Sequence, residues 1–99
     1  MAKYEKQLRE EFLKFIADHS PRYGNWYVGV AKKAEDALYK KHKVDKKQDL
    51  WLWDIATDNR EAKMLEEHLL MMGVDGDAIN SDPKAIQVYI YKKTTATVQ

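Results

Sequence analysis

Three short runs of aromatic and β-branched residues, separated by helical patterns, constrain the fold of this chain more than any other feature. The runs are residues 25–31, 50–56 and 85–93, and their composition is typical of β-strands. With 99 residues, the chain has the length of about one domain. Three strands of this size form only a small sheet, and the helical stretches between them are expected to cover it.

The pattern within each run indicates how the strand lies in the sheet. The run Asn25–Ala31 is apolar on both faces, which predicts a central strand. The other two runs alternate, so each should present one set of side chains to either side of the sheet. In residues 50–56 the two sets are Trp51, Trp53 and Ile55 against Leu50 and Leu52. In residues 85–93 they are Ile86, Val88 and Ile90 against Gln87, Tyr89 and Tyr91.

Helical periodicity occupies the intervals before and between the strands. Residues 3–18 place their apolar side chains on one arc, and residues 34–43 form a shorter helix of the same kind. The third helix has the clearest boundaries, because Asp58 and Glu61 form a capping box and Gly73 follows its end near Met72. The order α-β-α-β-α-β predicts a single α+β domain, residues 1–99, with three helices flanking a three-stranded, mostly antiparallel sheet. Residues 73–84 are expected to form a loop, and the last six residues to fray.

Composition excludes several classes of protein. Apolar residues make up 44% of the chain, too many for a disordered tail, and no apolar run approaches the ~20 residues of a membrane span. Cysteine is absent, which excludes thiolate chemistry and cysteine-ligated metals, and the three histidines share no spacing typical of a zinc site. The first residues lack the apolar core of a secretory signal. A cytoplasmic protein with no membrane partner is therefore expected.

Glu66 stands against the apolar pattern of the third helix. It projects into a stripe formed by Ala62, Leu65 and Leu69, and a carboxylate among apolar side chains is costly unless it is paired or coordinated. Two interpretations stay open. Glu66 either pairs with a lysine or lies where the stripe meets solvent, or it serves as a metal-binding or acid–base carboxylate. Lys41 has a similar position on the second helix, where a lysine stem at a helix end is the simpler interpretation.

Lysines are concentrated in one segment of an otherwise balanced chain. The stretch from residue 32 to residue 47 carries seven lysines and three acidic residues, a local charge of +4 against +1 for the whole chain. Such a segment can contact the phosphates of DNA or RNA. The predicted contact residues are Lys32, Lys33, Lys40, Lys41 and Lys43. The alternative is a solvated helix end whose lysines favour the helix dipole.

Two motifs in this order resemble the GIY-YIG nuclease domain, in particular the N-terminal incision domain of the bacterial excision-repair nuclease. They are YVGVAK at residues 27–32 and EAKMLEEHLL at residues 61–70, and the likeness spans residues 25–72. The resemblance implies that Glu66 would hold a divalent metal that assists phosphodiester hydrolysis as a Lewis acid. It also implies that Tyr27 would position or activate the attacking water. Lys32 matches a lysine that follows this strand in the repair enzymes.

The chain departs from the pattern of the family at the catalytic arginine. That position falls on Ala37 or Leu38, and neither side chain can stabilise developing phosphate charge. Lys41, one helical turn further on, offers a cation but not the bidentate fork of an arginine.

The first strand of the family, with its tyrosine, is also missing ahead of Tyr27. The C-terminal strand, residues 85–93, resembles it in sequence. One hypothesis is that this strand fills the vacant position, as a circular permutation would, and brings Tyr89 towards Tyr27 and Glu66. Ordinary completion of the sheet is the alternative.

These features favour a degenerate GIY-YIG-like domain that acts as a nucleic-acid-associated or regulatory module, without nuclease activity and therefore without a cofactor. One alternative is a weak Mg²⁺-dependent nuclease that uses Glu66, Tyr27, Tyr89 and Lys41. A second alternative is a protein-interaction module that keeps the fold as a scaffold. The near-zero net charge favours this last interpretation, and so do Met64 and Met71, which lie opposite the leucine stripe of the third helix and suggest that it is covered on two sides.

Overall fold

The computed structural model describes residues 2–76 and 82–99 and has the α+β fold that the sequence predicts. The helical elements are α1 (Glu5–His19), the 3-10 turn η1 (Tyr23–Asn25), α2 (Ala34–Asp36), the π-helical turn η2 (Ala37–Lys41) that continues α2, and α3 (Asn59–Met71). The strands are β1 (Trp26–Ala31), β2 (Trp51–Ile55) and β3 (Gln87–Lys92). Of the predicted loop 73–84, residues 77–81 lie outside the described residues.

The three strands form one antiparallel sheet in the order β1-β3-β2. Tyr89 of β3 lies opposite Gly29 of β1 on one side and opposite Trp53 of β2 on the other. The prediction that residues 25–31 form the central strand is therefore wrong, because β3 occupies the centre. β1 is nonetheless buried along most of its length, since side chains pack against both of its faces.

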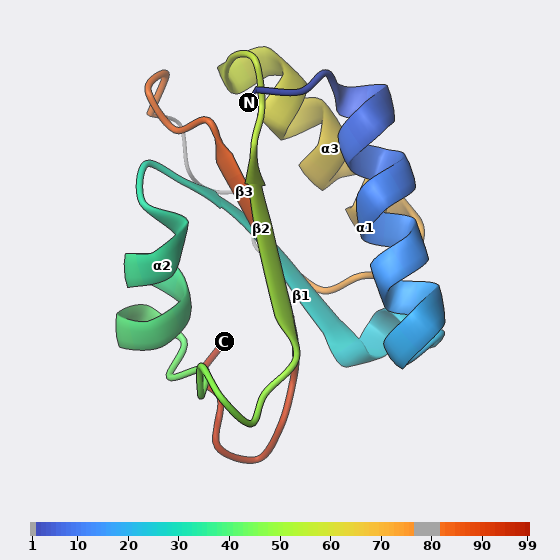
Figure 1. The fold of residues 1–99 in the computed structure, drawn as a ribbon, viewed down its shortest axis with the longest axis vertical. Helices are drawn as coiled ribbons and strands as arrows, with labels where there is room; N and C mark the ends of the chain where they lie inside the picture. The colour runs from blue at the N-terminus through green and yellow to red at the C-terminus, as the bar shows by residue number, and fades with distance from the viewer. Residues whose placement is uncertain (1, 77–81) are drawn as a thin grey trace.

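Helices cover the two faces of the sheet. α1 and α3 lie together on one face, and α2 with η2 lies on the other (Figure 1). Because side chains alternate along a strand, each strand contributes to both layers. The side chains packed with α1 and α3 are Trp26, Val28, Val30, Leu52, Val88 and Ile90. Those packed with α2 and η2 are Tyr27, Trp51, Trp53, Tyr89 and Tyr91. The predicted alternation in β2 and β3 is confirmed.

Polar contacts fix the start of α3 against the start of α1. Asp58 caps α3, as its position predicts, because its Oδ1 accepts a hydrogen bond from the backbone N–H of Glu61 at 2.9 Å. The Glu61 carboxylate accepts from the backbone N–H of Glu5, 2.9 Å away on α1. His68 Nδ1 lies 2.8 Å from Glu5 Oε2, so a second contact joins the two helices.

The two outer edges of the sheet are covered to different extents. Asp75 pairs with the edge of β1 through its backbone. Its backbone oxygen accepts from the N–H of Val28 at 2.8 Å, and its N–H donates to the backbone oxygen of Trp26 at 2.9 Å. Among the residues that the structure describes, the edge of β2 has a neighbour only at its end. There the backbone N–H of Lys3 donates to the backbone oxygen of Ile55, and the backbone oxygen of Lys3 accepts from the N–H of Thr57, both at 2.9 Å.

The expectation that the last six residues fray is wrong. Residues 94–99 turn back over the α2 side of the sheet, where Thr97 is buried. The backbone N–H of Val98 donates to the backbone oxygen of His42 at 2.8 Å. These contacts hold the C-terminal segment against the folded domain, although Thr97 is the one residue of the segment that is buried.

Candidate functional site

Polar side chains are buried on the α2 side of the sheet, between β1, β3 and the end of η2. His42, which directly follows η2, is fully buried. Its Nε2 lies 2.9 Å from the Tyr89 hydroxyl, and its Nδ1 lies 2.6 Å from the backbone oxygen of Val98. Because a carbonyl oxygen only accepts, these partners assign the proton to Nδ1. In the neutral ring Nε2 then accepts from Tyr89.

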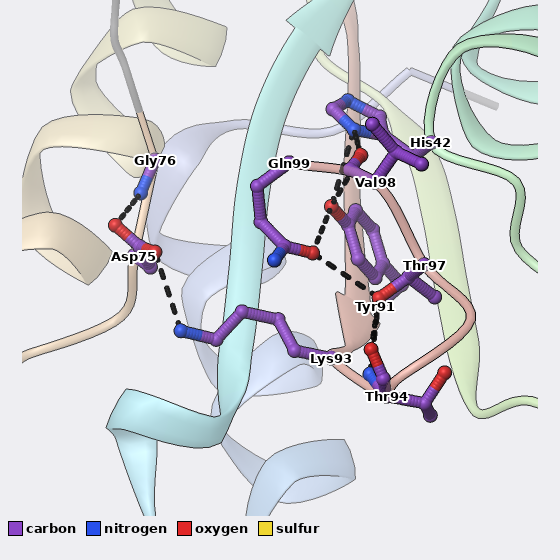
Figure 2. A network of polar contacts seen from close by, with 9 residues as sticks. All are labelled: His42, Asp75, Gly76, Tyr91, Lys93, Thr94, Thr97, Val98 and Gln99. Carbon is purple, nitrogen blue, oxygen red and sulfur yellow. Dashed lines mark hydrogen bonds and ion pairs between the residues drawn. The ribbon is translucent and has the colours of Figure 1, made fainter.

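Two further tyrosines complete this group, the tyrosine–histidine cluster (Tyr27, His42, Tyr89 and Tyr91). Tyr27 stacks on Tyr91 with ring centroids 5.3 Å apart, and its centroid lies 4.9 Å from that of His42. Figure 2 shows the C-terminal residues beside this cluster: Tyr91 Oη lies 3.1 Å from His42 Nδ1 and 3.4 Å from Gln99 Oε1. The chain's own C-terminal segment thus helps to seal the cluster from solvent.

The local sequence explains how the cluster is packed. Leu38, His42 and Val44 are buried, and the lysines that lie between them in sequence are exposed. Gly29 lies against the ring of Tyr89, where any side chain on residue 29 would overlap the phenol. The glycine of the YVGVAK motif therefore has a packing role.

The structure brings together only some of the predicted catalytic residues. Tyr27 and Tyr89 lie in one cluster, because β3 pairs directly with β1. Glu66 is buried on α3, which packs on the opposite face of the sheet, and its Oε1 lies 3.6 Å from Lys63 Nζ. The expected approach of Tyr89 to Glu66 is not observed. Of the two interpretations of Glu66, the structure contains the pair with a lysine.

Other elements of a metal-dependent site are equally dispersed. In residues 2–76 and 82–99, no three His, Asp or Glu side chains form a group that could hold a metal ion. At the two positions that match the catalytic arginine, Leu38 is buried and Ala37 is half-buried, whereas Lys41 is exposed. Lys41 therefore points away from the buried tyrosines.

The predicted phosphate-contact lysines are all exposed. Two of them have carboxylate partners: Lys32 Nζ lies 3.2 Å from Asp82 Oδ2, and Lys40 Nζ lies 3.7 Å from Asp36 Oδ1. The remaining three, Lys33, Lys41 and Lys43, form no ion pair with any described residue, and the same holds for Lys46 and Lys47. Lys46 instead lies over the Tyr39 ring, with Nζ 5.7 Å from the centroid.

A small charged group that the sequence did not reveal joins α1 to β2. Lys3 Nζ lies 2.7 Å from Asp54 Oδ2 and 3.3 Å from Glu11 Oε1. Burial, and then the hydrogen bond and charge of Asp54, raise the pKa of Glu11. For Asp54, burial opposes ionisation, but hydrogen bonds with Glu11, Lys3 and the Ile55 N–H lower its pKa. The hydrogen bond to Asp54 raises the pKa of Lys3.

Comparisons of the chain with protein-family models, with curated proteins and with solved structures found no match. Among the described helices, none combines the length and the apolar character needed to cross a bilayer. Function is therefore inferred from the fold and from the contacts described above.

Sequence reasoning missed the role of His42, because it tested the histidines only for metal-ligand spacing. A signal was present: His42 lies four residues after Leu38 and two before Val44, in a segment whose other members are mostly lysines. A histidine at that spacing from two apolar residues is placed on the buried side of the segment. Its partners Tyr89 and Val98 lie 47 and 56 residues away in the sequence, so local patterns could not identify them.

Proposed function

We propose that the protein is a nucleic-acid-associated module that contacts phosphate backbones through residues 32–47 and does not cleave them. The observation that carries the proposal is the set of exposed lysines that no described carboxylate neutralises. These are Lys33, Lys41, Lys43, Lys46 and Lys47. Lysines of this kind release counterions when they bind phosphates, which gives sequence-independent binding.

Buried anchors hold this segment against the sheet. Leu38, His42 and Val44 are each at most 5% exposed, so the intervening backbone is fixed and its lysines project outward. Of the nearby acidic groups, Asp45 accepts hydrogen bonds at Oδ1 from the backbone N–H groups of residues 47 and 48, and Asp36 pairs with Lys40. The segment therefore holds its exposed lysines in a fixed arrangement, which favours their binding to the phosphates of a nucleic acid over binding to small counterions.

The absence of cleavage is proposed from the placement of the residues that the GIY-YIG resemblance singles out. Glu66 and the tyrosine–histidine cluster lie on opposite faces of the sheet, and the positions that match the arginine hold Ala37 and Leu38. A metal carboxylate, a tyrosine and a cation therefore do not converge on one substrate phosphate. The pairing of β3 with β1 supports a degenerate GIY-YIG-like arrangement in which β3 takes the place of the missing first strand.

A charge-reversal experiment tests the binding surface. Lys41→Glu combined with Lys47→Glu should weaken binding of a short single-stranded DNA or RNA at low salt by about tenfold or more. The matched control is Lys6→Glu combined with Lys84→Glu, which changes the net charge equally at exposed positions outside the segment. Fluorescence anisotropy measures both. Equal weakening by the two pairs, or no binding by the wild type, would overturn the proposal.

A nicking assay tests the second part of the proposal. Supercoiled plasmid incubated with the protein and Mg²⁺ or Mn²⁺ should stay intact. Nicking by the wild type that disappears in Glu66→Gln, while circular dichroism shows the variant folded, would establish the weak nuclease instead.

A further inference from the structure

The outer edge of β2 has backbone groups that no described residue pairs with. The hydrogen bonds of Leu50 and Ala56 point towards β3, since Lys92 N–H donates to the oxygen of Leu50 and Ala56 N–H donates to the oxygen of Ile86. In an antiparallel ladder the alternate residues point their N–H and C=O groups the other way. Trp51 and Trp53 thus present theirs at the free edge, where an added strand would pair with them.

The chain itself shows that this edge accepts a neighbour. Lys3 already forms two backbone hydrogen bonds there, to residues 55 and 57, but the segment then turns into α1. In Figure 1, β2 is the strand nearest the viewer, with α2 on one side and α1 and α3 on the other. The stretch of edge at residues 51–53 is left without a partner among the described residues.

A hollow lies beside this edge on each face of the sheet. On the α1 side, a hollow of about 210 Å³ has Phe15 and Leu52 in its wall, with Glu11, Lys14 and Asp18 around them. On the α2 side, a hollow of about 310 Å³ is lined by Lys33, Glu35, Asp36, Trp53 and Gln87. Because successive side chains of a strand point to opposite faces, a strand added to β2 would direct them alternately into the two hollows.

The chemistry of the hollows indicates which side chains they would receive. The α1 hollow exposes apolar atoms of Phe15 and Leu52, which suits an aliphatic side chain. The α2 hollow is lined by Trp53 and by the carboxylates of Glu35 and Asp36, with Lys33 and Gln87 beside them, and an aromatic side chain next to carboxylates suits a lysine or arginine. Of the four carboxylates in the two linings, Glu11, Asp18 and Asp36 already pair with Lys3, Lys14 and Lys40. Glu35 has no ion pair with a described residue, so it is the carboxylate of the α2 hollow that is open to a basic side chain.

We propose that the free edge of β2 binds an extended peptide segment of a partner protein in which aliphatic and basic residues alternate. The segment adds to the sheet as an antiparallel fourth strand. Residues directly opposite each other in an antiparallel pair share a face. The basic residues of the peptide therefore lie opposite Trp51 and Trp53, exchange backbone hydrogen bonds with them and direct their side chains into the α2 hollow. The aliphatic residues enter the α1 hollow.

The test uses the full chain and a synthetic peptide, acetyl-KVRVKV-amide, titrated in ¹H–¹⁵N NMR spectra. We expect binding with a dissociation constant below ~1 mM, with the largest shifts at the backbone amides of residues 51–54. A control peptide of the same sequence carries methyl groups on the backbone nitrogens of its basic residues. It keeps the charge but loses the backbone hydrogen bonds, so its binding should fall by about tenfold or more. Equal binding of the two peptides would overturn the proposal.

Protein variants separate this surface from the lysine segment. Glu35→Gln combined with Asp36→Asn should weaken peptide binding several-fold, whereas Glu10→Gln combined with Glu67→Gln, at exposed positions elsewhere on α1 and α3, should not. Peptide binding by Lys41→Glu with Lys47→Glu should persist, which distinguishes this inference from the proposed contact with nucleic acid. A dimer in sedimentation, with amide shifts at residues 51–53 that depend on protein concentration, would identify a second copy as the occupant and contradict the proposal.

Discussion

Gly29 and Tyr89 form a contact on which the packing of the α2 side depends. A methyl group on Gly29 would overlap the Tyr89 hydroxyl and ring, and Tyr89 is also the hydrogen-bond partner of the buried His42. Gly29→Ala should therefore lower the free energy of unfolding by about 2 kcal/mol, in the usual range for overpacking of a core. Urea denaturation measures this change.

A double-mutant cycle provides the control for this prediction. In the background of Tyr89→Ala, which removes the ring that the methyl group meets, Gly29→Ala should cost much less than in the wild type. An equal cost in both backgrounds would mean that the glycine is required for its backbone and not for the ring.

The group of Lys3, Glu11 and Asp54 predicts opposite effects of two conservative substitutions. The pKa of Asp54 is lowered, so its charge stabilises the fold above the unfolded pKa, and this contribution is lost as the pH falls through the folded pKa. The pKa of Glu11 is raised, so its ionisation destabilises the fold at neutral pH, and this penalty is relieved as the pH falls through the folded pKa.

Asp54→Asn should therefore destabilise the protein at pH 7, and Glu11→Gln should be neutral or stabilising. Each effect should be a few tenths of a kcal/mol to about 1 kcal/mol, because both groups are partly solvated. Thermal unfolding at pH 7 and near pH 3 measures them, and both differences should shrink at the lower pH. Destabilisation by Glu11→Gln that equals that of Asp54→Asn would contradict this assignment.

At the scale of elements, the C-terminal segment contributes to the fold through η2. Val98 exchanges two hydrogen bonds with His42, one through the imidazole and one through the backbone, and Thr97 is buried. Removal of residues 94–99 would expose His42 and Tyr91 to water. The truncated chain should lose about 2 kcal/mol or more of unfolding free energy, measured by urea denaturation.

A local readout separates this prediction from general loss of stability. Amide hydrogen exchange should accelerate in residues 37–44 of the truncated chain before it accelerates in α1 or α3. Uniform acceleration in all elements, or unchanged stability, would show that the segment does not support η2.

For most elements, the sequence predicted the type of element and the face on which its apolar side chains lie. It did not predict which elements lie next to one another. The alternation of residues in β2 and β3 defined two faces, and Asp58 defined the start of α3. Burial of both faces of residues 25–31 suggested a central strand, yet that burial comes from the helices on both sides, and Asp75 covers the outer edge. The polar sequence of residues 94–99 suggested fraying, because its stabilising partner His42 is far away in the chain. The order of the strands and the position of the C-terminal segment depend on such contacts between residues far apart in the sequence.

At the scale of the whole molecule, charge is divided between surfaces although the total is only +1. The segment from residue 32 to residue 47 carries +4, and within it Glu35 and Asp36, together with Lys33, line the hollow on the α2 side of β2. A molecule with extents of 32 × 26 × 23 Å can thus present exposed lysines to phosphates and an adjoining edge, with Glu35 beside it, to a basic peptide. A near-neutral total charge does not exclude either kind of partner.

The salt dependence of nucleic-acid binding tests the central claim most directly. The logarithm of the association constant for single-stranded DNA should fall linearly with the logarithm of salt concentration, with a slope of about −0.7 for each phosphate contact. Lys41→Ala combined with Lys47→Ala should reduce the magnitude of that slope by about 1.4, and Lys6→Ala combined with Lys84→Ala should leave it unchanged. An identical slope in the wild type and the Lys41/Lys47 variant, or binding that salt does not weaken, would contradict the assignment of this surface.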